Sequence, residues 1–172
     1  MFSWFGKVSF VPFSKVQDFA VHLKDGRLMG SRCKSCGYQT FPPRADCPEC
    51  LSGEFEFVEY TGAGKVFTFS TISAAPTGFE DLVPYTVVVV DLHEGGRLLG
   101  WLGASISAEE VRIGMDVQTV PRIDESSEDI KVFYTIERAG TTWGKAPRPT
   151  SAEPPASSSP GTRTAVPVTP TR

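Results

Sequence analysis

All four cysteines of the 172-residue chain lie in one short segment and form two pairs. The four residues are Cys33, Cys36, Cys47 and Cys50. Two residues separate the thiols within each pair, so that one tight turn can direct both sulfurs at a single ion, and two such turns complete a tetrahedron. Gly37 permits the left-handed backbone that such a turn favours. The spacing predicts one structural zinc ion per chain, held in a hairpin of the rubredoxin type.

Three alternatives to a zinc site are possible for these four thiols. Iron fits the same four ligands, and the sequence alone does not distinguish the two metals, although no other redox feature occurs in the chain. Structural disulfides are rare in a reducing cytosol. A thioredoxin-like redox pair would adjoin a βαβ unit, and none is predicted here. Because four protein ligands leave no open position for water, the metal is expected to be structural.

Few groups remain that could act as nucleophile or base. His22 is predicted in a helix and His93 in a hairpin turn, where a structural or exposed role is expected for both. No serine occupies a G-x-S-x-G elbow. The sequence "GAGKV" at 62–66 lacks the first glycine and the Ser/Thr of a P-loop, so it is interpreted as a turn. We therefore predict no catalytic residue.

A cluster of cations precedes and enters the cysteine segment, although the whole chain has a net charge of −3. Its members are Lys24, Arg27, Arg32, Lys34 and Arg44. The cluster is either a solvated face or a site for a phosphorylated ligand such as the nucleotide end of coenzyme A. The overall acidity argues against nucleic acid or an anionic membrane as a partner.

The elements that must position these groups are predicted to be mainly β. Apolar residues at helical spacing predict a short amphipathic helix that begins after Ser14 as N-cap and stops at Gly26. Roughly six strands between residues 54 and 138, with a helical candidate "SAEEVRIG" at 107–114, predict a closed barrel of the OB-fold type. Gly95 and Gly96 provide the turn of a tight hairpin.

The two ends of the chain differ in composition. From residue 144 onward the chain holds seven of the fourteen prolines and no aromatic residue, so it is expected to be a disordered tail. Residues 1–19 carry five of the twelve phenylalanines and are expected to pack on the body or on a partner. Residues 124–129, "DESSED", are expected to form an acidic surface loop. No membrane span or secretory signal is evident, and we expect a cytoplasmic protein.

The predicted fold is an N-terminal helix and rubredoxin-like zinc ribbon, followed by an OB-fold β-barrel and a disordered C-terminal tail. The predicted boundaries are 1–25 for the aromatic segment and helix, 26–53 for the ribbon, 54–143 for the barrel and 144–172 for the tail.

Several segments together resemble a known family over residues 14–138. They are "RCKSCGYQTFPPRADCPEC", "GKVFTFSTI", "PYTVVVVDLHEGGRLLGWL" and "VRIGMDVQTV". The family, long labelled a domain of unknown function, joins a helix and rubredoxin-like zinc ribbon to an OB-fold. Its members typically pair with thiolase-like or lipid-transfer-type condensing enzymes that act on acyl-CoA, and the small subunit of benzoylsuccinyl-CoA thiolase is one example. Cys33, Cys36, Cys47 and Cys50 match the zinc ligands of this family.

The resemblance implies a non-catalytic accessory subunit that helps to assemble an acyl-CoA site, with a coenzyme A thioester as ligand of the complex. The basic cluster becomes a candidate for the CoA phosphates, and residues 2–13 a candidate for the subunit contact. The aromatic start and the long tail depart from the family and leave the particular partner and substrate open. The main alternative is a nucleic-acid-binding module, because zinc ribbons and OB-folds both serve that role. A free-standing acyl-CoA carrier or thioesterase ranks below both, since no base is visible.

Overall fold

The computed structural model describes residues 4–6, 13–124 and 130–142. In order, its elements are α1 (Asp18–Lys24), β1 (Met29–Cys33), β2 (Gln39–Thr40), β3 (Phe55–Glu59), β4 (Ala63–Ile72), β5 (Tyr85–Leu92), β6 (Arg97–Leu102), β7 (Asp116–Asp124) and β8 (Lys131–Arg138). No helix in these ranges is long and apolar enough to cross a membrane. The tail at 144–172, most of the acidic loop and most of residues 1–13 lie outside the described residues.

Helix α1 begins one turn later than the sequence predicts. Ser14 is not its N-cap: that position belongs to Gln17, whose side chain makes no capping hydrogen bond. The Ser14 hydroxyl instead accepts from the N–H of Val16 at 3.3 Å, within a turn that precedes the helix. The predicted stop is confirmed, because the helix ends at Lys24 and Gly26 has a φ of 76°.

A three-stranded antiparallel sheet carries the cysteine segment. β1 lies at its centre, between β2 and β3. We expected the segment that forms β3 to be the first strand of the barrel, but all five of its residues pair with β1, from Met29 opposite Glu59 to Cys33 opposite Phe55. After the cysteine loops the chain runs back along β1, so β3 is used by the ribbon before the chain reaches the barrel.

The barrel confirms the predicted OB-type architecture. Five strands close in the order β4-β5-β6-β8-β7, and β7 pairs back with β4. Burial alternates strictly along β5, and its inward residues Val88 and Val90 are fully buried, as a strand with one face inside a barrel requires. Gly95 and Gly96 both have positive φ values and form the predicted hairpin turn between β5 and β6.

The helix predicted at 107–114 does not form. The Ser107 carbonyl accepts from the N–H groups of Glu110 and Val111 at 3.1 and 3.3 Å, which makes a single turn. Val111 is then drawn into the core, and Gly114, with a φ of 82°, donates to the carbonyl of Val66. The segment is therefore a loop that returns to β4: Val111 enters the core, whereas Ile113 is 70% exposed, so the segment presents no continuous apolar helical face.

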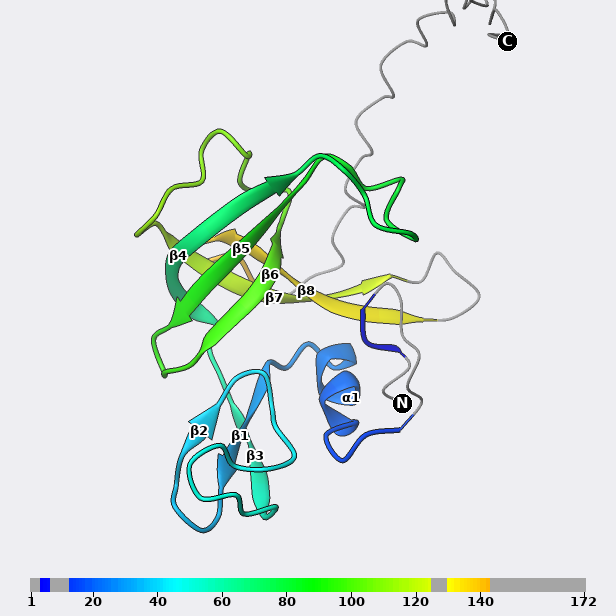
Figure 1. Cartoon of the computed structure of the whole chain (residues 1–172). Helices are drawn as coiled ribbons and strands as arrows, with labels where there is room; N and C mark the ends of the chain where they lie inside the picture. The colour runs from blue at the N-terminus through cyan, green and yellow to red at the C-terminus, as the bar shows by residue number, and fades with distance from the viewer. Residues whose placement is uncertain (1–3, 7–12, 125–129, 143–172) are drawn as a thin grey trace, which may run out of the picture.

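The helix, the ribbon and the barrel share one hydrophobic core. α1 packs on β1, β7 and β8. Figure 1 shows it beneath the long β7–β8 hairpin, which extends past the barrel. Phe41 of the ribbon lies 6.0 Å from Phe19 of α1 and 5.9 Å from Tyr134 of β8, between ring centroids. Phe5 joins this group through a parallel bridge to Val132, so this aromatic residue of the N-terminal segment packs on the body.

Candidate metal centre

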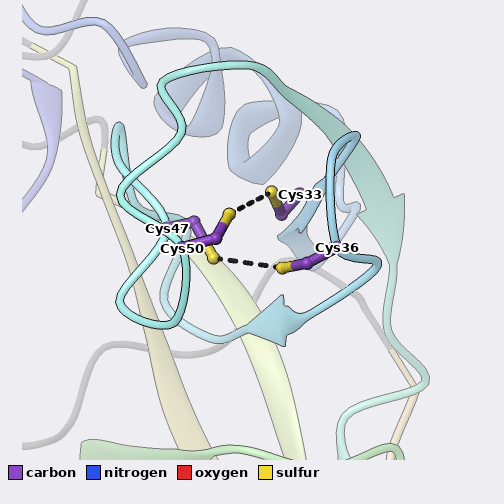
Figure 2. A group of neighbouring side chains, drawn as sticks. All are labelled: Cys33, Cys36, Cys47 and Cys50. Atoms are coloured by element: carbon purple, nitrogen blue, oxygen red, sulfur yellow. Dashed lines mark hydrogen bonds between the residues drawn. The ribbon is translucent and has the colours of Figure 1, made fainter.

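The four cysteines come from two loops of the ribbon that face each other. Cys33 ends β1 and Cys36 lies in the turn after it, whereas Cys47 and Cys50 lie in the long loop between β2 and β3. Figure 2 shows the sulfur of Cys33 directed at Cys50 and that of Cys36 directed at Cys47. The predicted pairs are therefore brought together, and each thiol faces one from the other loop.

The two loops have the same local backbone. In the first, the carbonyl of Cys33 accepts from the N–H of Gly37 at 2.9 Å, and the N–H of Cys33 donates to the carbonyl of Tyr38 at 2.9 Å. In the second, the carbonyl of Cys47 accepts from Leu51 at 3.0 Å, and its N–H donates to Ser52 at 2.9 Å. Each loop thus fixes its pair of thiols by backbone hydrogen bonds.

Both loops require a left-handed residue directly after the second cysteine. In the first loop this residue is Gly37, with a φ of 77°, for which the conformation carries no steric cost. In the second it is Leu51, with a φ of 59°, and within the described residues no other non-glycine residue has a positive φ. Leu51 is also 81% exposed, so packing of its side chain does not explain why a leucine occupies this left-handed position.

The separations of the sulfurs fit a tetrahedral ion. The Sγ atoms of Cys33 and Cys50 are 3.5 Å apart, as are those of Cys36 and Cys47, and all four lie within 4.8 Å of one another. A disulfide would need about 2.05 Å, so none is formed. Four sulfurs at about 2.3 Å from a zinc ion lie roughly 3.8 Å apart. The donor set therefore suits a soft divalent cation with four thiolate ligands.

Backbone N–H groups and neighbouring sulfurs shift the acidity of the thiols. The backbone N–H of Cys36 is the largest cause that lowers the pKa of Cys33 to about 6. The N–H of Tyr38 acts in the same direction on Cys36, but desolvation and the other three sulfurs outweigh it and raise the pKa of Cys36 to about 12. Adjacent thiolates repel each other, and a divalent cation between them removes that repulsion.

The second loop is tied to the segment before α1. The Lys15 ammonium group donates to the carbonyl of Gly53 at 2.6 Å and lies 6.0 Å from the ring centroid of Phe55. Ser35 and Ser52 join the two cysteine loops through a hydroxyl hydrogen bond of 2.9 Å. These contacts hold the loops in register around the sulfurs.

Neither histidine belongs to the metal cluster, which within the described residues consists of cysteines alone. His22 packs edge-on against Phe57, with 5.1 Å between ring centroids. His93 is exposed in the hairpin turn, and its backbone N–H donates to the carbonyl of Ala63. The structure thus places the first in a packing contact and the second at the surface.

The basic cluster is partly neutralised by the ribbon's own edge strand. Arg27 pairs with Glu59 at 3.0 Å and Arg32 with Glu56 at 2.6 Å, and both carboxylates lie on β3. The ammonium group of Lys24 lies 5.0 Å from the ring centroid of Trp4. Among the described residues, Lys34 and Arg44 make no ion pair.

A buried ion pair joins β7 and β8, and no pattern in the sequence predicted it. Arg122 of β7 bonds Glu137 of β8 at 2.6 Å, and their side chains are 10% and 4% exposed. The hydroxyl of Thr135 donates to the same carboxylate, and the N–H and hydroxyl of Ser105 donate to its second oxygen. In the register of β7 with β8, Arg122 lies opposite Phe133 and Glu137 lies opposite Gln118, so the ion pair runs diagonally across the two strands. Its members are 15 residues apart in the sequence, and only the pairing of the strands brings them together.

Two domain families match consecutive parts of the chain. They are described as "ChsH2, rubredoxin-like zinc ribbon domain", over residues 21–56, and "ChsH2, C-terminal OB-fold domain", over residues 57–122. A DUF35 domain-containing scaffold protein from Methanocaldococcus jannaschii is 40% identical over 116 residues, which are 66% of this chain and 82% of that protein. The resemblance predicted from the cysteine segment and the strand sequences is confirmed.

Two further similarities involve proteins described as parts of enzymes. Benzoylsuccinyl-CoA thiolase subunit BbsA of Thauera aromatica is 38% identical over 81 residues, which are 45% of this chain and 55% of that protein. The solved structure titled "Ltp2-ChsH2(DUF35) aldolase" contains a chain with a TM-score of 0.61 and 29% identity, and the match covers 76% of this chain and 99% of that one.

Proposed function

Because the chain belongs to the DUF35 family, in which a ChsH2-type zinc ribbon precedes a ChsH2-type OB-fold, we propose that it is a non-catalytic accessory subunit of a thiolase-like enzyme. The enzyme would make or cleave a carbon–carbon bond in an acyl-CoA substrate. The partner subunit would supply the reactive groups, and this chain would help to assemble the acyl-CoA site.

One observation carries this proposal. The match to a chain of the Ltp2-ChsH2 aldolase covers 76% of this chain and 99% of that one, with a TM-score of 0.61. A match of this extent, at 29% identity, supports a similar role as one chain of a larger enzyme. The relative BbsA is described as a subunit of benzoylsuccinyl-CoA thiolase, which supports the class of partner.

The chemistry of the metal centre supports an accessory role. Cys33, Cys36, Cys47 and Cys50 would hold one zinc ion, and with four protein ligands the ion would stabilise the loops and offer no site for substrate or water. All thiols of the chain lie in this cluster, so the nucleophilic cysteine expected of thiolase chemistry would come from the partner.

The ribbon also offers the better candidates for a contact with the CoA phosphates. Arg27 and Arg32 already pair with carboxylates, which reduces their attraction for an anion. Lys34 and Arg44 are exposed in the cysteine-bearing part of the ribbon, and we propose them as the phosphate contacts. Replacing both by alanine should raise the KM for acyl-CoA in the complex and leave kcat nearly unchanged. Arg27→Ala is the matched control.

The decisive experiment is purification of the chain with its native partner, followed by turnover assays of the components apart and mixed. We expect acyl-CoA turnover only when the thiolase-like subunit is present, and a higher rate or a stable complex when this chain is added. Turnover of acyl-CoA by this chain alone would contradict the accessory role. Tight, salt-sensitive binding of single-stranded nucleic acid without affinity for a thiolase-like subunit would favour the nucleic-acid module instead.

A further inference from the structure

Strand β5 is apolar on its outer face as well as inside the barrel. Its inward residues Val88, Val90 and Leu92 are buried, as the core requires. Its outward residues begin with Tyr85, Val87 and Val89, and all three are half-buried. A strand with one face toward water normally alternates apolar and polar residues. A run that is apolar on both faces indicates that the outer face is also covered.

The neighbouring strands extend this apolar surface. In the register of β5 with β6, Val87 is opposite Trp101 and Val89 is opposite Leu99, so these side chains share the outer face. A β-bulge in β4 interrupts the pairing with β5 between Val66 and Thr68, and the bulged residue Phe67 is exposed. We call this surface the outer β5–β6 face. It consists of Phe67, Tyr85, Val87, Val89, Leu99 and Trp101.

Within the described residues, the chain covers one end of the outer β5–β6 face and leaves the other end open. Phe79, from the loop between β4 and β5, packs on Tyr85 and Trp101 with centroid separations of 6.2 and 5.9 Å. At the other end Leu99 is 60% exposed and Phe67 is 46% exposed. α1 packs mainly on β1, β7 and β8. The exposures of Leu99 and Phe67 show that, in the part of the chain that the structure describes, this end of the face remains open.

The charges that border the face are already paired. Arg97 is held by both oxygens of Asp91 at 2.6 and 3.1 Å, and its guanidinium group lies 3.6 Å from the ring centroid of Phe67. Lys65 pairs with Asp116 at 2.7 Å. An OB-fold face that binds a polyanion needs unpaired cations beside its aromatic residues. Here the four charges cancel, so the face is complementary to a neutral, apolar protein surface.

We propose that the outer β5–β6 face is the surface on which this chain docks to its thiolase-like partner subunit. The inference rests on the proposed function and names the surface involved. Aromatic and apolar residues form the centre of such an interface, and the paired charges of Arg97 and Lys65 form its polar rim. The Phe79 cluster orders one end of the face before binding, which lowers the entropy cost of association.

The test measures affinity for the purified thiolase-like subunit by isothermal titration calorimetry. Leu99→Glu places a charge on the open end of the face at a position that is already exposed, so the chain should still fold. Phe67→Glu is a second variant on a different strand. Leu51→Glu is the matched control, because it makes the same change at an exposed leucine of the ribbon. We expect about tenfold or greater loss of affinity for the two face variants and about twofold or less for the control.

Four outcomes would overturn the proposal in different ways. Equal affinity of wild type and Leu99→Glu would reject the face and leave the proposed function standing. A wild-type chain that binds no thiolase-like subunit would reject both. Self-association of the chain alone that Leu99→Glu abolishes would assign the face to a second copy, and salt-sensitive binding of a single-stranded oligonucleotide that Leu99→Glu abolishes would assign it to nucleic acid. Circular dichroism of each variant verifies that it is folded.

Discussion

The cysteine-bearing part of the ribbon and the barrel are both built mainly on antiparallel strands, but different forces hold them. The barrel closes around fully buried aliphatic residues such as Val88, Val90 and Ile136. The cysteine-bearing part, residues 33–50, has two short loops around four sulfurs, and apart from cysteines its buried apolar side chains are Phe41 and Pro43. A structural zinc ion contributes about 10–16 kcal/mol of apparent binding energy in small domains, which can replace a core.

The two regions also treat buried polarity differently. The ribbon gathers four ionisable thiols at one point and needs a cation to keep them together. The barrel buries one cation and one anion, Arg122 and Glu137, which compensate each other. We therefore expect the stability of the ribbon to depend on a metal ion from solution, and the stability of the barrel to depend only on its own residues.

The largest effect is expected from removing one thiol of the ribbon. Cys36→Ser should abolish stoichiometric metal binding and disorder the cysteine loops, because three thiolates and a hydroxyl bind zinc far less tightly. The barrel should keep its fold. Elemental analysis would report the metal, and two-dimensional NMR would report the two regions separately.

Gln39→Ala, at an exposed position between the two loops, is the control for this experiment and should retain one metal ion per chain. If Cys36→Ser kept full metal content, the four-thiolate site would be wrong. If it unfolded the barrel as well, the two regions would not be independently stabilised.

A smaller but still large effect is expected from breaking the buried ion pair of the barrel. Arg122→Met leaves the Glu137 carboxylate buried without its cation and should cost about 3–5 kcal/mol of unfolding free energy. Arg138→Met removes the cation from an exposed pair with Glu110 and should cost about 1 kcal/mol or less. Urea denaturation would measure both, and equal costs would show that burial does not govern the pair.

Acidification should lower the unfolding free energy of the barrel by protonating the carboxylate of Glu137. Desolvation tends to raise the pKa of Glu137, but hydrogen bonds from Ser105, Arg122 and Thr135 outweigh it and lower the pKa. A lowered folded pKa means that the stabilisation is present above the unfolded value of about 4.3 and is lost as pH falls through the folded value. In urea titrations between about pH 7 and pH 3, the stability gap between wild type and Glu137→Gln should therefore narrow below about pH 4. A constant gap would contradict this assignment.

The two left-handed residues of the ribbon should respond in opposite directions. Leu51→Gly removes a steric cost of about 1 kcal/mol from the second loop, and its exposed side chain gives up little packing. Gly37→Ala introduces a similar cost into the first loop, where an added Cβ would meet no atom within 4 Å. Thermal denaturation of the metal-loaded chain would measure both shifts. A stabilising Gly37→Ala would show that the loops are not equivalent.

The smallest effect is expected from truncation after Trp143. The removed segment has no aromatic residue and seven prolines, so it has little apolar surface to bury. The unfolding free energy should change by about 0.5 kcal/mol or less, and the metal content should stay the same. A large loss of thermal stability would show that the segment docks on the ribbon or the barrel.

Most of the architecture could be predicted because local patterns determine it. The C-x-x-C pairs define the knuckles, and the runs of β-branched and aromatic residues in "YTVVVVDL" and "KVFYTIER" predict strands whatever their neighbours. The errors lie where tertiary partners decide. Ser14 was predicted as the N-cap of α1, but the helix begins later, with Gln17 at that position. The segment 107–114 was predicted to be helical, but it forms a loop that contacts the barrel. β3 was predicted in the barrel, but it belongs to the ribbon because it pairs with β1.

The candidate site was predictable in its ligands and not in its surroundings. The spacing of the four cysteines was enough to predict that their thiols lie together. The ion pairs of Arg27 and Arg32 with carboxylates of β3 depend on a strand register that no local pattern contains. The buried Arg122–Glu137 pair depends on register in the same way. Leu51 violates the preference for glycine at a left-handed position, and sequence rules predict glycine there.

The ribbon and the barrel meet backbone to backbone at two glycines. A Cβ on Gly62 would lie 2.7 Å from the carbonyl oxygen of Thr119, and one on Gly96 would lie 3.3 Å from the amide nitrogen of Phe41. No layer of flexible side chains separates the two units at these points, so there is nothing on which one could slide past the other. In an assembly the chain would therefore serve as a rigid spacer: a subunit seated on the barrel would find the tip of the ribbon at a fixed distance and orientation. Larger residues at these two positions would change that spacing while leaving both ends of the molecule chemically intact.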